Sequence, residues 1–109
     1  MDVFEVVAEP HRRAILDLLS DQPRPAGEIV AAFPALTQPA VSRHLRVLRE
    51  AGLVEARPAA QQRIYALKPD RLAELDAWLQ RFRRHWADHL DALERHLAAT
   101  APHRRDDQP

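Results

Sequence analysis

The sequence predicts a mainly α-helical fold that carries a small β-hairpin and ends in a long helix. Apolar residues recur at steps of three or four over most of the chain, and two β-prone stretches follow one another near its middle. No helix breaker interrupts the region from just after Pro69 to about Ala99. The chain has 109 residues, enough for one domain, which we expect to span residues 1–100.

Composition excludes several classes of protein. The hydrophobic share of 46% can fill a core, and the absence of cysteine excludes disulfides, thiolate metal ligands and a cysteine nucleophile. The only glycines are Gly27 and Gly52 and the only serines are Ser20 and Ser42, and none forms a phosphate-binding loop or a nucleophile elbow. The amino end, residues 1–5, is acidic, and no apolar run approaches the ~20 residues of a membrane span. We therefore expect a cytoplasmic protein that is not an enzyme and has no membrane partner.

Two helices are expected at the amino end. Val3, Phe4 and Val7 stand at helical spacing in a short first segment. Glu9-Pro10 then offers a helix start, because proline is well tolerated in the first turn. The second helix continues through residues 11–20, which carry an isoleucine and three leucines.

A connector and two further helices are expected next. Residues 21–25 contain two prolines and are expected to connect the second helix to a short third one at residues 27–33. Thr37 then stands where a side-chain cap begins a helix, with a proline in the first turn. This helix is predicted to run to about Ala51, because Gly52 suits a helix stop.

The carboxy-terminal half is predicted to contain the hairpin and the long helix. Strands are expected at residues 53–57 and 63–67, joined by a loop of five residues, 58–62. Residues 69–99 are predicted to form one helix, and residues 101–109, which are polar, a disordered tail. The apolar stripe of the helix consists of Leu72, Leu75, Leu79, Phe82, Trp86, Leu90, Leu93 and Leu97.

This order of elements is that of a winged helix-turn-helix, whose second helix enters the DNA major groove. The helix that starts after Thr37 fits that role. Val41, Leu45 and Leu48 share one face with His44 beside them, and polar and basic side chains lie opposite or flanking. We therefore predict double-stranded DNA as a partner. The predicted contacts, in the groove and at the wing, are Gln38, Pro39, Ser42, Arg43, Arg46, Arg57, Gln61, Gln62 and Arg63.

Positive charge is concentrated in this helix and hairpin. Sixteen basic and sixteen acidic residues cancel over the whole chain, so net charge indicates no partner. Residues 1–36 hold three basic and six acidic side chains, residues 37–68 hold six and two, and residues 69–109 hold seven and eight. Because Lys68 is the only lysine, nearly all basic contacts would be arginine, which suits bidentate binding of phosphate or guanine.

Three segments resemble the ArsR/SmtB family of bacterial winged-helix repressors. Residues 37–54 (TQPAVSRHLRVLREAGLV) are similar to the family's recognition helix and first wing strand. Residues 9–16 (EPHRRAIL) resemble its opening helix, and residues 63–67 (RIYAL) its second wing strand. The resemblance covers about residues 3–99. It implies a homodimer on a near-palindromic operator that represses transcription, usually of its own operon, until an effector releases it.

The positions at which family members hold metals do not fit a metal here. The helix that carries a cysteine pair in thiolate sensors reads Glu28-Ile-Val-Ala-Ala-Phe33 in this chain. The last helix offers His85, Asp88, His89 and His96, but not at the spacing of the family's other site type. We therefore predict no metal and no cofactor, and the resemblance is closer to the cysteine-free, non-metal branch. The effector remains unidentified.

A homodimer is also indicated by the apolar residues near the two ends. The stripe of the last helix has a near-heptad spacing and overshoots what a small helix-turn-helix unit can cover, although part of it must serve as core. The predicted interface consists of Val3, Phe4, Val7, Leu79, Phe82, Trp86, Leu90 and Leu93.

Three alternatives stay open at this point. The chain could be a winged-helix protein-interaction module without DNA binding, although Arg43 and Arg46 argue against it. It could be a repressor that senses a metal through histidines, since His85 and His89 stand one helical turn apart. An enzyme fragment is the weakest alternative, because carboxylates and histidines are nearly all that could act in catalysis.

Overall fold

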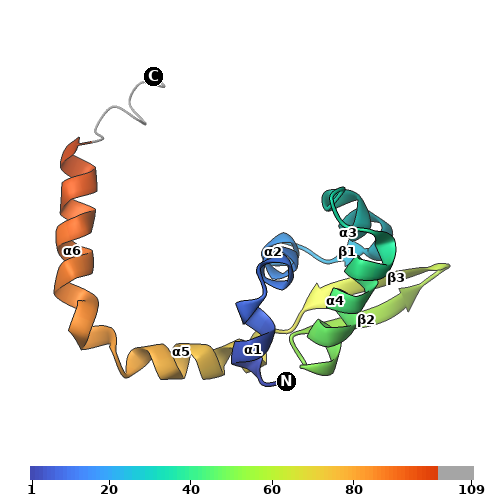
Figure 1. Cartoon of the computed structure of the whole chain (residues 1–109), viewed down its shortest axis with the longest axis horizontal. Coiled ribbons are helices and arrows are strands. Elements are labelled where there is room, and N and C mark those ends of the chain that lie inside the picture. Colours follow the sequence, from blue (N-terminus) through green and yellow to red (C-terminus); the bar gives the residue numbers. More distant parts are fainter. Residues whose placement is uncertain (101–109) are drawn as a thin grey trace. The chain divides into compact units, whose positions relative to one another are not determined.

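The computed structural model describes residues 1–100, which fall into two compact units, residues 1–75 and residues 76 onward (Figure 1). The tail predicted to be disordered, residues 101–109, lies outside the described residues. Within residues 1–100, no helix has both the length and the apolar character of a membrane span.

Two helices that meet at Glu9 open the first unit. α1 (Val3–Ala8) starts with a reciprocal cap, in which the N–H of Glu5 donates to the carboxylate of Asp2 and the N–H of Asp2 donates to that of Glu5. α2 (Pro10–Leu19) follows directly, with Glu9 as its capping residue. The helix start predicted at Glu9-Pro10 is confirmed.

Two arginines of α2 satisfy the carbonyl groups at the end of α1. The Nε of Arg12 donates to the carbonyl of Val6 at 2.8 Å. The guanidinium of Arg13 donates to the carbonyls of Val7 and Ala8 at 2.7 and 3.1 Å. Terminal carbonyls have no partner within their own helix, so these contacts replace hydrogen bonds to water. Two of the three basic residues before residue 37 are thereby structural.

α3 (Ala26–Ala32) and α4 (Gln38–Glu50) form the helix-turn-helix. The hydroxyl of Thr37 accepts a backbone N–H of the first turn of α4 at 3.2 Å, so the predicted cap is confirmed. At the other end Gly52 has φ +79° and donates its N–H to a carbonyl of the last turn at 3.0 Å. This is the left-handed ending that glycine favours, as predicted.

The sheet has three antiparallel strands in the order β1-β3-β2. β2 (Val54–Ala59) and β3 (Gln62–Leu67) form the predicted hairpin. β1 (Arg24–Pro25) pairs with the other side of β3. The region around β1 was expected to be only a connector, which is wrong for these two residues. A proline is compatible with the edge position of β1, where one side of the strand has no ladder partner.

The turn of the hairpin is shorter than predicted. Ala59 pairs with Gln62, so only Ala60 and Gln61 connect the strands, and the expected five-residue loop is wrong. Ala60 has φ +57°, the only positive φ among the non-glycine residues that the structure describes. Two-residue hairpin loops need such a φ, which is usually supplied by glycine or asparagine. Alanine gave no signal for it in the sequence.

The core of the first unit lies between α1, α2, α3, α4 and the sheet. α1 contributes Val3 and Val6, both fully buried, whereas Phe4 is exposed and Val7 is partly buried. The predicted assignment of Val3 to a dimer interface is therefore wrong, because a side chain with no exposed surface cannot contact a second subunit. The buried residues are Val3, Val6, Ile15, Leu16, Leu19, Ile29, Val41, Leu45, Leu48, Ala51, Leu53, Val54, Tyr65 and Ala66.

The carboxy-terminal region is not one helix. A 3-10 turn (Pro69–Arg71) leads into α5 (Leu72–Gln80), and α6 (Arg83–Thr100) starts after a break. At the break, the N–H groups of residues 81, 82 and 85 each donate to the carbonyl three residues earlier, at 3.2, 3.0 and 2.8 Å. These tighter bonds replace the α-helical pattern. The prediction of an uninterrupted helix from 69 to 99 is thus wrong.

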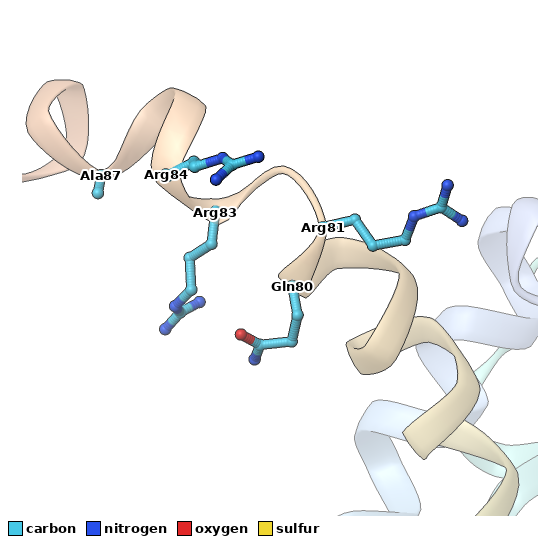
Figure 2. Close-up of a pocket in the computed structure, with 5 residues that line it drawn as sticks. All are labelled: Gln80, Arg81, Arg83, Arg84 and Ala87. Atoms are coloured by element: carbon cyan, nitrogen blue, oxygen red, sulfur yellow. The ribbon is translucent and has the colours of Figure 1, made fainter.

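A concentration of positive charge accompanies this break. Arg81, Arg83 and Arg84 surround it, and in Figure 2 the side chain of Arg83 points to a different side from those of Arg81 and Arg84. In a continuous helix Arg81 and Arg84 would be neighbours on one face, and like charges at that spacing are destabilising. No proline or glycine lies at the break, so the helix-breaker rules gave no warning of it.

The apolar stripe of this region contributes little to the core. Leu72 and Leu75 pack against the core of the first unit. In the described part of the second unit, residues 76–100, no side chain is fully buried. The part of the stripe that serves as core is therefore Leu72 and Leu75.

Candidate nucleic-acid interface

α4 separates an apolar face from a polar one, as predicted. Val41 and Leu48 are fully buried and Leu45 is 3% exposed. The opposite side, together with the first turn, is open to solvent. Its exposed residues include Gln38, Pro39, Ser42, Arg43 and Arg46, all of which were predicted to contact DNA.

The arginines of this face have no acidic partners. Within residues 1–100, no ion pair neutralises Arg43 or Arg46. Arg24 is different, since its guanidinium lies 3.2 Å from Asp21 and 3.6 Å from Glu28. A guanidinium without a carboxylate partner keeps its donors available for phosphate oxygens or base edges.

The register of the hairpin places the two wing arginines on opposite faces. Arg57 pairs with Ile64, and Arg63 pairs with Pro58. Directly paired residues point to the same face and successive residues alternate, so Arg57 and Arg63 point to opposite sides of the hairpin. Arg57 also lies 3.8 Å from Glu55, an ion pair that Arg63 does not share. The sequence alone does not distinguish the two arginines.

The tip of the wing lies next to the start of α3. An open depression brings Gln61, Gln62 and Arg63 together with residues 25–28, which begin α3. Glu28 is the acidic residue in this lining. The predicted wing residues Gln61, Gln62 and Arg63 are therefore gathered in one place, with Arg57 on the other face of the hairpin.

A cluster between the start of α2 and α4 was not predicted from the sequence. Glu9, His11 and His44 each offer a ligand atom, and these atoms lie within 4.8 Å of one another. The Nδ1 of His11 is 3.1 Å from Oε2 of Glu9. The His11 and His44 rings stack with centroids 5.7 Å apart. His44 is far from the other two in sequence, so only the packing of α2 on α4 shows the cluster.

The pKa values of Glu9 and His44 in this cluster are both lowered. Burial raises the pKa of Glu9, but hydrogen bonds from the His11 ring and from the N–H groups of Arg12 and His11 lower it. The charge of His44 lowers it further, and the resulting pKa is about 2. Burial lowers the pKa of His44. The carboxylate of Glu9 raises this pKa, whereas the positive charges of Arg12, His11 and Arg43 lower it further. The cluster thus combines a carboxylate with an imidazole that resists protonation.

The second unit carries the exposed apolar residues predicted for an interface. Leu79 is 41% exposed, Phe82 38%, Leu90 48% and Leu93 52%. Trp86 is partly buried. Side chains of this kind rarely gather on a helix that faces only water, so they mark an interaction surface.

The folded helices, the sheet and the exposed basic helix define a winged helix-turn-helix DNA-binding protein. Residues 7–57 match the helix-turn-helix domain family. The HTH-type transcriptional regulator Rv2034 of Mycobacterium tuberculosis is 43% identical over 79 residues, 72% of this chain and 73% of the relative. The transcriptional repressor SdpR of Bacillus subtilis is 32% identical over 81 residues, 74% of this chain and 89% of the relative.

Solved structures agree with these relatives. The crystal structure of a possible transcriptional regulator for arsenical resistance is 42% identical with a TM-score of 0.65, covering 84% of this chain and 92% of that one. An ArsR family transcriptional regulator is 26% identical with a TM-score of 0.68, covering 77% of this chain and 91% of that one. The chain belongs to the ArsR/SmtB family of DNA-binding transcriptional regulators, and this is a family of regulators, not of enzymes.

Proposed function

We propose that this regulator represses transcription in the cytoplasm as a homodimer bound to a near-palindromic operator. The observation that carries the proposal is the pair of exposed arginines on α4, Arg43 and Arg46, which no carboxylate in residues 1–100 neutralises. A relative of similar length is named as a transcriptional repressor, which supports repression as the direction of control.

In this proposal α4 reads the major groove. Gln38 and Pro39 lie in its first turn, the end of a recognition helix that meets base edges, and Ser42, Arg43 and Arg46 continue the same exposed side. Arg57, Gln61, Gln62 and Arg63 contact the backbone from the wing. Phosphate contacts fix the position of the protein, and base contacts give it its sequence preference.

The dimer is held by apolar residues that the subunit leaves exposed or only partly buried. We assign the contact to Phe4, Val7 and the stripe Leu79, Phe82, Trp86, Leu90 and Leu93. Val3 is left out because it is buried in its own subunit. Two-fold symmetry then presents two copies of α4 to two half-sites of the operator.

The signal that releases the protein from the operator is an effector, and the residues do not identify its chemical class. No thiolate can act as a sensor, since the chain has no cysteine. Control of its own operon is the arrangement that the family resemblance favours. Sequencing the DNA fragments that the protein retains from its own genome would identify the operator and the neighbouring genes.

The decisive test is a gel-shift titration with that operator. Replacing Arg43 and Arg46 together by alanine should lower operator affinity at least tenfold, since each base-reading arginine contributes about 1–3 kcal/mol. The double change of Arg81 and Arg84 to alanine, which removes the same two positive charges from around the α5–α6 break, is the matched control and should bind as the wild type does. Unchanged affinity in the double variant would show that α4 does not read the DNA.

A further inference from the structure

Glu9, His11 and His44 form a cluster that DNA binding does not use. The three side chains come from the start of α2 and the middle of α4, and one ligand atom of each lies within 4.8 Å of the others. We propose that this cluster is a binding site for a divalent transition-metal ion of the zinc type, with one carboxylate and two imidazole ligands from a single subunit.

The distances are close to those that a metal needs. Nitrogen and oxygen ligands lie about 2.0–2.1 Å from zinc, so adjacent ligand atoms in a tetrahedral site are about 3.3 Å apart. The Glu9 Oε2 and the His11 Nδ1 are already 3.1 Å apart. The ligand atom of His44 lies within 4.8 Å of the other two, so it completes the set after a shift of at most about 1.5 Å, which rotation of its ring and of the stacked His11 ring can supply.

The carboxylate of Glu9 is held in position by its role at the start of α2. Its Oε1 accepts the backbone N–H groups of His11 and Arg12 at 2.6 and 3.1 Å. The other oxygen, Oε2, accepts a hydrogen bond from Nδ1 of the His11 ring, and an ion bound by both atoms would take the place of that proton. Hydrogen bonds to the second oxygen of a ligating carboxylate orient it, so part of the entropic cost of binding is already met by the fold.

The charged groups around the cluster are few. Arg12 and Arg43 are the basic residues that act on His44, and Glu9 is the acidic one. Arg12 is engaged elsewhere, because its guanidinium donates to the carbonyls of Val6 and Glu5 at 2.8 and 3.4 Å. Within residues 1–100 neither guanidinium is neutralised by a carboxylate, so an ion would bind against the charges of Arg12 and Arg43, offset by the carboxylate of Glu9.

The ligand chemistry selects the class of ion. Imidazole nitrogen suits Zn²⁺, Co²⁺ and Ni²⁺, whereas Mg²⁺ and Ca²⁺ require sets of oxygen ligands that a single carboxylate cannot provide. Three protein ligands leave a fourth position for water. Since the ion joins α2 to α4 in the folded state only, its binding raises the melting temperature. This site does not depend on the proposed function, because it can form without DNA.

The experiment is a titration of the tag-free full chain with Co²⁺ and Zn²⁺. Visible absorption reports the coordination of Co²⁺, and competition with a chromophoric chelator gives the zinc affinity. The wild type should bind one ion per subunit, and zinc but not Mg²⁺ should raise its melting temperature. His11→Ala removes a ligand that is 47% exposed, so the fold should persist and zinc affinity should fall at least tenfold.

The matched control removes the histidine pair on α6. His85 and His89 stand one turn apart and could bind an ion by themselves, so the double variant with both changed to alanine must keep the wild-type affinity if the cluster is the site. His44→Asn should match the loss in His11→Ala, once circular dichroism shows that it is folded. The proposal is overturned if the ion is lost in the α6 control, if His11→Ala binds as tightly as the wild type, or if the wild type binds no stoichiometric ion.

Discussion

Glu9 is the residue on which the start of α2 depends. Its carboxylate accepts two backbone N–H groups that have no intrahelical partner, and it also contacts the His11 ring. Each of these contacts favours the ionised form. The pKa of about 2, below the ordinary value of 4.5, is the result.

Because the carboxylate of Glu9 has a lowered pKa in the folded state, the free energy of unfolding should depend on pH. A group whose pKa is lower in the folded state stabilises the fold fully above its unfolded pKa, and this contribution is lost as the pH falls through its folded pKa. Wild type should therefore be more stable than Glu9→Gln by about 1 kcal/mol at pH 6, and the difference should disappear as the pH falls from about 4.5 toward 2. Urea unfolding at several pH values, with a chelator present, measures it. A pH-independent difference would contradict the account.

Ala60 has a strained backbone conformation in the turn between β2 and β3. A non-glycine residue at φ +57° costs about 1–2 kcal/mol relative to glycine, and the more flexible unfolded chain of a glycine variant offsets part of that. We expect Ala60→Gly to raise the free energy of unfolding by about 0.5–1 kcal/mol. Ala59→Gly, inside β2, is the matched control and should lower it. If both changes destabilise, the turn is not of the two-residue kind.

At the scale of elements, the wing arginines should prove unequal. Arg63 has no ion-pair partner in residues 1–100 and lies with the tip residues, whereas Arg57 must give up its contact with Glu55 to bind phosphate. Arg63→Ala should lower the slope of log affinity against log salt by about 1 per contact, and Arg57→Ala should change it less. Operator titrations between low and moderate salt provide both slopes. A larger change in Arg57→Ala would place the opposite face of the hairpin on the DNA.

Elements with strong local signals were predictable from the sequence. Thr37 and Gly52 mark the two ends of α4, and the spacing of Val41, Leu45 and Leu48 identifies its buried face. Both ends and this face depend on interactions within a few residues. Local chemistry therefore sufficed for the recognition helix and for the predicted DNA-reading side, whose contacts with DNA stay a prediction.

Features that depend on tertiary packing or on weak local preferences were not predictable. β1 is a strand only because β3 lies beside it, and the turn at Ala60 follows from the strand register, not from a turn residue. The break after Gln80 has neither proline nor glycine to announce it. The approach of His11 to His44 needs the packed arrangement of α2 and α4.

At the scale of the molecule, the dimer proposal can be tested at Trp86. Burying a tryptophan is worth about 1.5–3 kcal/mol, and symmetry doubles the effect of each substitution. We expect Trp86→Ala to dissociate or unfold the dimer at concentrations where the wild type is intact, and operator affinity to fall with it. Analytical ultracentrifugation at low micromolar concentration measures the assembly.

A second variant separates assembly from folding. Leu93 is 52% exposed in the subunit, so Leu93→Glu should disrupt a dimer without disturbing the first unit. Arg95→Glu, a charge change two residues further along α6, is the control. A folded wild-type monomer would contradict the dimer, and a Trp86→Ala protein that melts earlier but still sediments as a dimer would place Trp86 inside its own subunit.

The lack of buried side chains in α6 has a consequence for dosage. An isolated helix of this length is only marginally stable in water, so in the proposed dimer α6 would gain order from the second subunit. For the proposed dimer, the active form then scales with the square of subunit concentration whenever monomers predominate. Halving the supply of protein would leave about a quarter of the operator-binding species. A regulator built in this way responds to its own rate of synthesis more steeply than in simple proportion.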